Sequence, residues 1–308
     1  MEGFIDTLNG LIWSNWLVYL CLGAGAYFTL ATLFLQIRCF PDMIRQLRSG
    51  ESSEEGISSF QSLMISLAGR VGVGNIAGVA TAIAFGGPGA VFWMWLVALL
   101  GSATSFIECC LAQIYKETDR DTGEYRGGPA YYIEKTYKHT KAAPFMLVYA
   151  VIFAVCMLLA TSYFLPGIQS NGVAAAVENA WGINVWISAT IMAVLLAFII
   201  IGGVKRIANF ASMVVPFMAG LYIIIAIVVL FANASQIPEV FGTIFRSAFD
   251  KEAAFSGMLG AAIMWGVKRG IYSNEAGQGT GPQSAAAAEV SHPAKQGFVQ
   301  AFAVYIDT

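Results

Sequence analysis

Arg70-Val-Gly-Val-Gly-Asn-Ile-Ala-Gly78 and Arg269-Gly-Ile-Tyr-Ser-Asn-Glu-Ala-Gly277 are two similar stretches of this chain, and their four matching residues all lie 199 positions apart. Each stretch lies inside an apolar run that is long enough to cross a membrane. Glycine disfavours a helix interior by about 1 kcal/mol, and asparagine is a favourable N-cap residue. Each stretch therefore predicts that one helix ends and a second begins within a single membrane span.

The composition places most of the chain in lipid rather than in water. Charged residues make up 12% of the 308 residues and hydrophobic residues make up 57%, whereas charged residues are about 25% of an ordinary soluble domain. Long segments carry no charge, among them residues 7–37, 71–107 and 142–177. The net charge of −2, without a basic stripe, argues against a nucleic acid as a partner.

Cysteine and histidine are too few and too scattered for a metal centre or a histidine-based catalytic set. The five cysteines show no CxxC or other metal-ligand spacing, and the two histidines, His139 and His292, lie in polar connections. We therefore expect neither an enzyme nor a bound cofactor.

Apolar runs of about 20 residues predict seven membrane spans and the start of an eighth, which begins near residue 294. Because that last run is cut off at residue 308, we expect the sequence to be a fragment of a longer protein. The complete spans are predicted near 13–36, 57–85, 89–115, 143–163, 184–204, 208–232 and 253–289.

The basic residues of the connections predict the orientation of a multi-pass protein of the plasma (inner) membrane. With the N-terminus outside, the inner connections hold twelve Lys and Arg residues, and the outer ones hold only Arg246 and Lys251. The connections at 116–141 and 205–206 then face the cytoplasm, and those at 164–183 and 233–252 face outside. Pro129 and the tyrosines that follow it predict a short helix on the inner surface.

In this orientation the two broken helices run in opposite directions, which is typical of an inverted repeat. We predict an all-α polytopic membrane protein with a five-plus-five inverted-repeat transporter fold that is truncated in its second repeat. Residues 1–308 form one transport domain, in which 13–36 is an extra helix, 57–232 is the first repeat and 253–308 is the incomplete second repeat.

A helix break offers partners for both charges of a free amino acid. N–H groups with partial positive charge lie where the second half begins, and C=O groups with partial negative charge lie where the first half ends. At the first break we expect a carboxylate to meet the N–H groups of Gly74, Asn75 and Ile76. An ammonium group or a sodium ion would meet the carbonyls around Val71 and Gly72 and, from the opposing helix, those near Trp265 to Ile271. Hydroxyl, amide and carbonyl oxygens also suit sodium, and we expect Asn75, Gly72 and Ser273 to be ligands of that ion. The candidate substrate-binding residues are Val71, Gly72, Gly74, Asn75, Ile76, Trp265, Gly270, Ile271, Ser273 and Asn274.

The two similar stretches allow two other interpretations, close helix packing and dinucleotide binding. Their glycines and alanines could serve only to let helices pack closely, as small residues do in many membrane proteins. The run from Gly72 to Ala77 also fits the dinucleotide pattern GxGxxA, but it lacks the preceding strand and the acidic residue at the expected distance.

Charged side chains flank both breaks. Such residues are expensive inside a membrane, and they usually form ion pairs or serve function. We expect Arg70, Arg269, Glu275 and Glu108 to form gating or helix-fixing ion pairs, because backbone groups can meet the charges of the substrate.

Three motifs resemble those of the sodium:alanine symporter family, also called alanine or glycine:cation symporters. The run from Gly86-Gly-Pro-Gly to Gly101 is similar to the signature of that family. The run from Gly72 to Thr81 resembles its adjoining broken helix, and Tyr272-Ser-Asn-Glu-Ala-Gly277 resembles the corresponding segment of the second repeat.

The resemblance implies the fold of neurotransmitter:sodium symporters, in which a Gly-x-Gly-Asn turn contributes a sodium ligand. This turn corresponds to Gly72, Gly74 and Asn75. The resemblance also implies about eleven spans in the complete protein. The eighth core helix, which contributes to a second sodium site in this fold, is then absent from the present chain.

The sequence thus predicts a secondary active transporter that couples sodium movement to uptake of a small neutral amino acid, alanine or glycine, by alternating access. Its expected partners are this amino acid, sodium and the lipid bilayer. Proton coupling through Glu275 or Asp307 is an alternative within transport, and an ion channel is the alternative from another class.

A cysteine at position 135 tests the predicted orientation. In a full-length protein without its native cysteines, Lys135→Cys should be labelled by an impermeant maleimide only after the cytoplasmic side is opened, because residue 135 lies in a predicted inner connection. Labelling of this cysteine in intact cells would overturn the topology.

Overall fold

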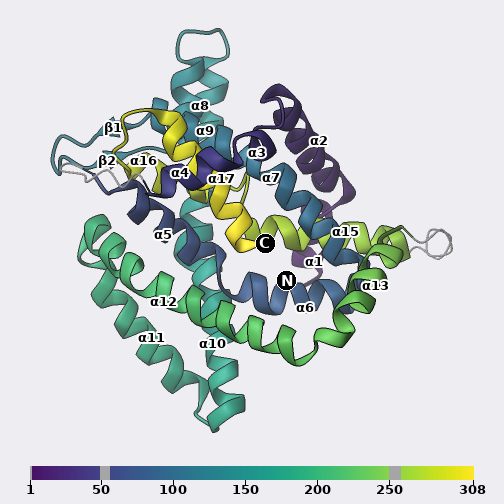
Figure 1. The fold of residues 1–308 in the computed structure, drawn as a ribbon. Helices are drawn as coiled ribbons and strands as arrows, with labels where there is room; N and C mark the ends of the chain where they lie inside the picture. Colours follow the sequence, from purple (N-terminus) through teal and green to yellow (C-terminus); the bar gives the residue numbers. More distant parts are fainter. Residues whose placement is uncertain (1, 49–55, 250–257) are drawn as a thin grey trace.

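The computed structural model describes residues 2–48, 56–249 and 258–308, and these are almost entirely helical (Figure 1). This confirms the prediction of an all-α protein. Short irregular helices, π at η1 and 3-10 at η2, and one two-stranded hairpin complete the described part. The elements are α1 (Glu2–Ile12), α2 (Asn15–Ala31), α3 (Leu35–Arg38), α4 (Phe40–Arg48), α5 (Ser59–Arg70), α6 (Val73–Gly86), α7 (Gly89–Ile114), β1 (Glu117–Thr118), β2 (Tyr125–Arg126), α8 (Pro129–Tyr137), α9 (Ala143–Leu159), η1 (Ala160–Phe164), α10 (Leu165–Trp181), α11 (Val185–Ile200), α12 (Gly203–Ala232), η2 (Ala234–Gln236), α13 (Ile237–Phe249), α15 (Met258–Asn274), α16 (Thr280–Ala287) and α17 (Pro293–Asp307).

Five helical stretches are long and apolar enough to cross a membrane, and α11 is a shorter apolar helix. Most predicted spans coincide with these helices, and α8 confirms the short helix that was expected at Pro129. The beginning of the predicted 253–289 span lies outside the described residues. The five stretches are 9–31, 59–86, 89–114, 143–181 and 203–232.

The first predicted span, 13–36, ends earlier than expected. Helix α2 stops at Ala31, and Leu33 and Phe34 adopt left-handed backbone angles, with φ of 53° and 56°. The Phe34 N–H bonds back to the Thr29 carbonyl at 2.8 Å, which closes the helix end in a Schellman-like turn. The chain then continues as the short helices α3 and α4, and α4 packs against α17.

The fourth predicted span, 143–163, is much too short. Helices α9 and α10 join through the π-helical turn η1 into one run of 39 residues, so residues 164–181 are helical rather than an outer loop. Pro166 lies in the first turn after η1, where a missing N–H is tolerated. The Pro-Gly pair at 166–167 therefore begins a new stretch of α-helix instead of a loop.

Helix α7 is the central packing element, because α2, α13, α15, α16 and α17 all pack against it. Glycines allow the approach of α15. A Cβ atom on Gly266 would lie 2.5 Å from the Ala90 carbonyl oxygen, and one on Gly270 would lie 2.3 Å from Val97 Cγ1. These glycines serve close helix packing, as small residues often do in membrane proteins.

The two broken helices, α5–α6 and α15–α16, run antiparallel. Figure 1 shows α5 near α16 on one side of the fold, and α6 packs along α15 on the other. Along the chain α5 precedes α6, whereas α16, the neighbour of α5, follows α15, the neighbour of α6. The chain therefore runs through the two breaks in opposite directions. This arrangement supports the predicted inversion of the two helices, while the five-plus-five repeat remains a proposal.

Buried hydroxyl and amide groups join α5 to α16 and α17. Ser62 donates to the Ser284 carbonyl oxygen at 2.7 Å, and Gln296 Nε2 donates to Ser62 Oγ at 2.7 Å. Ser66 and Ser284 share a hydrogen bond of 2.5 Å between their hydroxyls. Such bonds between helices fix their register where lipid offers no competing partner.

Hydrogen bonds join the residues that precede α5 to the residue that follows α16. Ile57 pairs with Ala288 in a short parallel bridge. Lys116, which follows α7, donates from Nζ to the Ala288 carbonyl oxygen at 2.7 Å and lies 3.9 Å from the centre of the Tyr125 ring. Desolvation by burial lowers the pKa of Lys116 to about 8, although Glu289 partly opposes the shift.

Replacing Lys116 by Met should flatten the pH dependence of stability in the full-length protein. Between the folded pKa of about 8 and an unfolded value of about 10.4, the unfolded state binds more protons, so the free energy of unfolding rises with pH. We expect the melting temperature of the parent to rise more steeply than that of Lys116→Met from pH 8 to pH 10. Lys138→Met, at an exposed position, is the control and should behave like the parent; equal slopes in the parent and Lys116→Met would contradict the shift.

Candidate functional site

The first break lies where the sequence predicts it. Helix α5 ends at Arg70, Val71 and Gly72 are extended, and α6 begins at Val73. Asn75 Oδ1 accepts the Gly72 N–H at 2.9 Å, so the asparagine closes the break from the third position of α6 rather than from the N-cap. Gly72 itself is the N-cap residue.

The backbone groups of this break are used differently from our expectation. The N–H groups of Asn75 and Ile76, which were expected to meet a carboxylate, point to the Gly72 carbonyl oxygen at 3.2 and 3.3 Å. The same contacts occupy the Gly72 carbonyl, which was expected to meet a cation. The Val73 N–H instead donates to a side chain of another helix, Gln169 Oε1 of α10, at 3.1 Å.

The second break is displaced from its predicted position. Residues 267–273 are continuous helix, and α15 ends only at Asn274. The interruption covers residues 275–279, where Glu275, Gly277 and Gly279 have φ of 54°, 84° and 88°. The alternative that small residues serve packing is correct for Gly270, which lies against α7.

The two matching sequence stretches therefore occupy different structural positions. Asn75 lies in the first turn of a second half-helix, whereas Asn274 is the last residue of a first half-helix. The side chain of Asn274 is 1% exposed, and its Oδ1 accepts the Ala276 N–H at 3.0 Å. Its Nδ2 has no hydrogen-bond partner among the described residues.

Three polar side chains from separate helices meet beside the first break. Asn75 Nδ2 donates to Asp307 Oδ1 at 2.6 Å and to the Asp307 carbonyl oxygen at 2.7 Å. Ser273 donates to the same Oδ1 at 3.1 Å. We call Asn75, Ser273 and Asp307 the α6–α15–α17 cluster. Two of its members were expected sodium ligands. Asp307 had been considered only for proton coupling, since sequence does not show that the end of α17 reaches α6.

Within the described residues, the ion pairs predicted at the breaks are absent. Arg70 is 1% exposed and donates to the Gln300 carbonyl oxygen at 3.2 Å and to Ser105 Oγ at 3.5 Å. Glu275 accepts the Thr280 hydroxyl at 2.6 Å. In the described part of the chain the ion pairs are Arg126–Asp119 and Lys135–Glu117, both in the connection that includes α8.

Other predicted site residues face neighbouring helices. The Arg269 guanidinium lies 5.5 Å from the centre of the Trp265 ring, which stacks on Phe85 at 4.9 Å. Ile271 packs in a buried cluster with Val18 and other apolar residues. In the structure Trp265 and Ile271, which were predicted to contact the ligand, pack against neighbouring helices. Arg269, which was predicted to form an ion pair, lies against Trp265 of its own helix.

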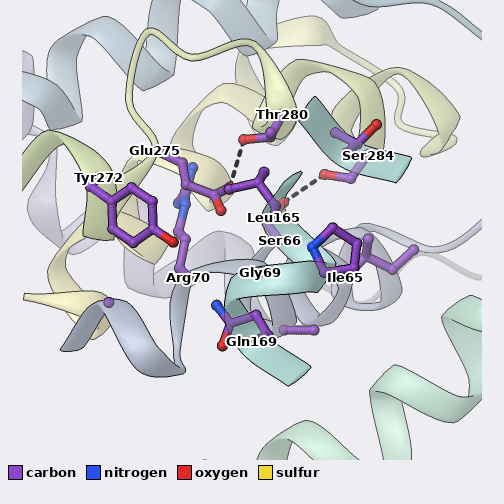
Figure 2. Close-up of a pocket in the computed structure, with 14 residues that line it drawn as sticks. Ile65, Ser66, Gly69, Arg70, Leu165, Gln169, Tyr272, Glu275, Thr280 and Ser284 are labelled. Atoms are coloured by element: carbon purple, nitrogen blue, oxygen red, sulfur yellow. Dashed lines mark hydrogen bonds between the residues drawn. The ribbon is translucent and has the colours of Figure 1, made fainter. Parts of the chain in front are cut away.

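A cavity of about 280 Å³ lies between the broken helices and the η1–α10 turn. Figure 2 shows Arg70, Glu275 and Tyr272 on one side of it, with Gln169 on another. Of the predicted substrate-binding residues, Gly74 lines it. Most of its polar lining was not predicted from the sequence. Gln169 lies beyond residue 163, where the fourth span was predicted to end, and the other polar residues come together only through contacts between distant segments. The missed lining residues are Ser66, Thr161, Gln169, Tyr272, Thr280 and Ser284.

The chemistry of this region suits a small polar ligand and a hard monovalent cation. Ligand pockets usually exceed about 300 Å³, so this cavity favours a small molecule. Within the described residues, no group of three or more His, Cys, Asp or Glu side chains could hold a metal ion. The cluster at Asp307 offers carboxylate, hydroxyl and amide groups instead, and such oxygen atoms suit sodium.

Several known proteins are similar to this chain over all or nearly all of its length. A putative sodium/proton-dependent alanine carrier protein, YrbD of Bacillus subtilis, is 56% identical over 308 residues, which are 100% of this chain and 62% of the relative. The probable sodium/glutamine symporter GlnT of the same organism is 47% identical over 310 residues, which are 100% of this chain and 63% of that relative. The sodium/alanine symporter AgcS of Methanococcus maripaludis is 42% identical over 307 residues, with 99% and 67% covered.

The chain thus spans less than two thirds of the length of the first two relatives. The model of the sodium:alanine symporter family matches residues 1–308. This family consists of transporters rather than enzymes, in agreement with the sequence-based expectation. The chain belongs to the sodium:alanine symporter family.

Proposed function

We propose that the full-length protein is a secondary active transporter that couples inward movement of sodium to uptake of alanine or glycine by alternating access. The observation that carries this proposal is the α6–α15–α17 cluster beside the first break, which brings Asn75, Ser273 and the Asp307 carboxylate together. Three helices contribute to it, so a bound ion would tie their positions together.

Sodium is the ion that the cluster fits best. Asp307 supplies a negative charge at 8% exposure, and Ser273 supplies a hydroxyl at 5% exposure. The Asn75 amide would turn so that its oxygen, rather than its Nδ2, faces the ion, because a cation excludes the N–H donor. The predicted ligands Asn75 and Ser273 stay in the proposed set, and Asp307 joins them in place of the Gly72 carbonyl.

The amino acid would occupy the neighbouring cavity. Its carboxylate would take the place of Gln169 on the Val73 N–H, at the partially positive end of α6. Its ammonium group would lie toward Glu275, which lines the cavity from the second break. Named relatives include alanine carriers and a glutamine symporter, and the cavity of about 280 Å³ favours alanine or glycine.

The proposed orientation follows from the sequence and from the antiparallel broken helices. With the N-terminus outside, α5 and α16 are the cytoplasmic halves of the broken helices, and α6 and α15 are the outer halves. Residues 57–232 and 253–308 would form the first repeat and the incomplete second repeat in the plasma (inner) membrane.

Transport in proteoliposomes tests the function. Alanine uptake by the full-length protein should require an inward sodium gradient and should stop when potassium or choline replaces sodium. Counterflow of labelled alanine should occur, since a carrier exchanges its substrate whereas a channel does not. Uptake that persists without sodium and follows a pH gradient would instead favour proton coupling through Glu275 or Asp307, two buried carboxylates that form no ion pair in the described residues.

Variants of the α6–α15–α17 cluster test the ion site. Asn75→Ala and Asp307→Asn should each raise the sodium concentration for half-maximal uptake by roughly tenfold or more, because cation affinity depends on the number and charge of its ligands. Asn75→Ser should be intermediate, since serine caps a helix well but reaches less far. Asn233→Ala, at an exposed asparagine, is the control. Unchanged sodium dependence in well-folded Asn75→Ala and Asp307→Asn would remove these residues from the site.

A further inference from the structure

The backbone of the second break is shaped to hold an anion. Glu275, Gly277 and Gly279 alternate with other residues and have positive φ of 54°, 84° and 88°. Alternation of this kind turns successive N–H groups toward one side and forms a concave anion-binding nest. Helix α16 begins at Thr280, so the partially positive end of its dipole adds to the same side.

The nest is already occupied by a side chain of α7. Glu108 is 6% exposed, and its Oε1 accepts the Gly277 N–H at 3.1 Å. A side chain on Gly277 would be strained at this φ. Glycine at 277 therefore allows the left-handed backbone conformation in which its N–H meets Glu108.

The first break differs in the groups that meet its backbone N–H donors, because its carboxylate, Asp307, accepts from the Asn75 side chain instead. The Val73 N–H donates to the neutral side-chain amide of Gln169, and the Gly72 N–H donates to the side-chain amide oxygen of Asn75. In the described residues, no carboxylate accepts a backbone N–H of the first turn of α6. An arriving carboxylate can displace a neutral amide there. At the second break it would have to displace a buried carboxylate or lie beside it, which like-charge repulsion disfavours.

We propose that Glu108 is a built-in anion of the second break, a positioning residue that holds the start of α16 and directs the substrate carboxylate to the first break. The statement that Glu108 directs the substrate carboxylate to the first break rests on the proposed function. The statement that Glu108 acts as an anion at the second break does not, because it concerns only the Glu108 contact with Gly277. Removing the carboxylate leaves the nest and the α16 dipole in need of an anion, and a small anion from solution can take its place.

The experiment uses full-length protein purified in chloride and compares the parent, Glu108→Ala, and Glu178→Ala as a control at an exposed acid of α10. Chloride is then exchanged for gluconate at constant sodium and ionic strength. In Glu108→Ala we expect the melting temperature to fall by several degrees and alanine uptake to fall roughly tenfold, with saturable recovery on return of chloride, because a small anion binds at a helix N-terminus. The parent and Glu178→Ala should not respond.

Formate tests whether the vacated position accepts a carboxylate. In Glu108→Ala held in gluconate, formate should restore the melting temperature as chloride does, whereas it should leave the parent unchanged. The melting measurement needs neither sodium coupling nor transport, so it separates a failure of this inference from a failure of the proposed function. A folded Glu108→Ala whose stability ignores both anions would overturn the inference.

Glu108→Gln decides the matter if Glu108→Ala does not purify in a folded form. The glutamine has nearly the shape of glutamate, but its amide is neutral and has one acceptor atom where the carboxylate has two. We expect a lower melting temperature that chloride does not restore, because the amide still fills the nest. A melting temperature equal to that of the parent would show that the negative charge of Glu108 is not required.

Discussion

Backbone N–H and C=O groups inside a membrane must find partners within the protein, because lipid offers none. A helix that stops before it has crossed the membrane frees several such groups at once, and in this chain α5 ends at Arg70 and α15 ends at Asn274. Each break depends on a side chain from another helix, Gln169 of α10 for the first and Glu108 of α7 for the second. The position of the breaks thus constrains how α7 and α10 pack.

Helix α7 meets this constraint for the second broken helix and also positions the ion cluster. Its glutamate reaches the α15–α16 interruption only because α15 approaches closely at Gly266 and Gly270. Further along α7, Ser102 donates to the Ala301 carbonyl oxygen at 3.0 Å and fixes α17. The end of α17 carries Asp307, so one helix holds both the second break and the proposed sodium ligand in register.

Sequence predicted the helical class and the first break, because Gly72 and Asn75 act locally within a few residues of each other. It misplaced the second break because a glycine that packs against a neighbour, such as Gly270, resembles a glycine that ends a helix. It missed Gln169 and the pairing of Asp307 with Asn75, since both depend on tertiary contacts between distant segments. The local sequence therefore predicted the first break, whereas the second break and the contacts of Gln169 and Asp307 depend on long-range packing.

The two breaks differ in backbone geometry and in the groups that meet their backbone N–H donors, and this difference suits a carrier. At the first break the hydrogen bonds of Val73 with Gln169 and of Asn75 with Asp307 are ones that a substrate and an ion can replace in kind. Exchange of Gln169 for a carboxylate costs little net hydrogen bonding, whereas a turn of the Asn75 amide toward an ion would also release the Gly72 N–H. At the second break the Glu108 contact is buried, and under the inferred role of Glu108 as an anion it is stronger than a neutral bond. Under the proposed function, one break exchanges ligands while the other keeps the helix end fixed.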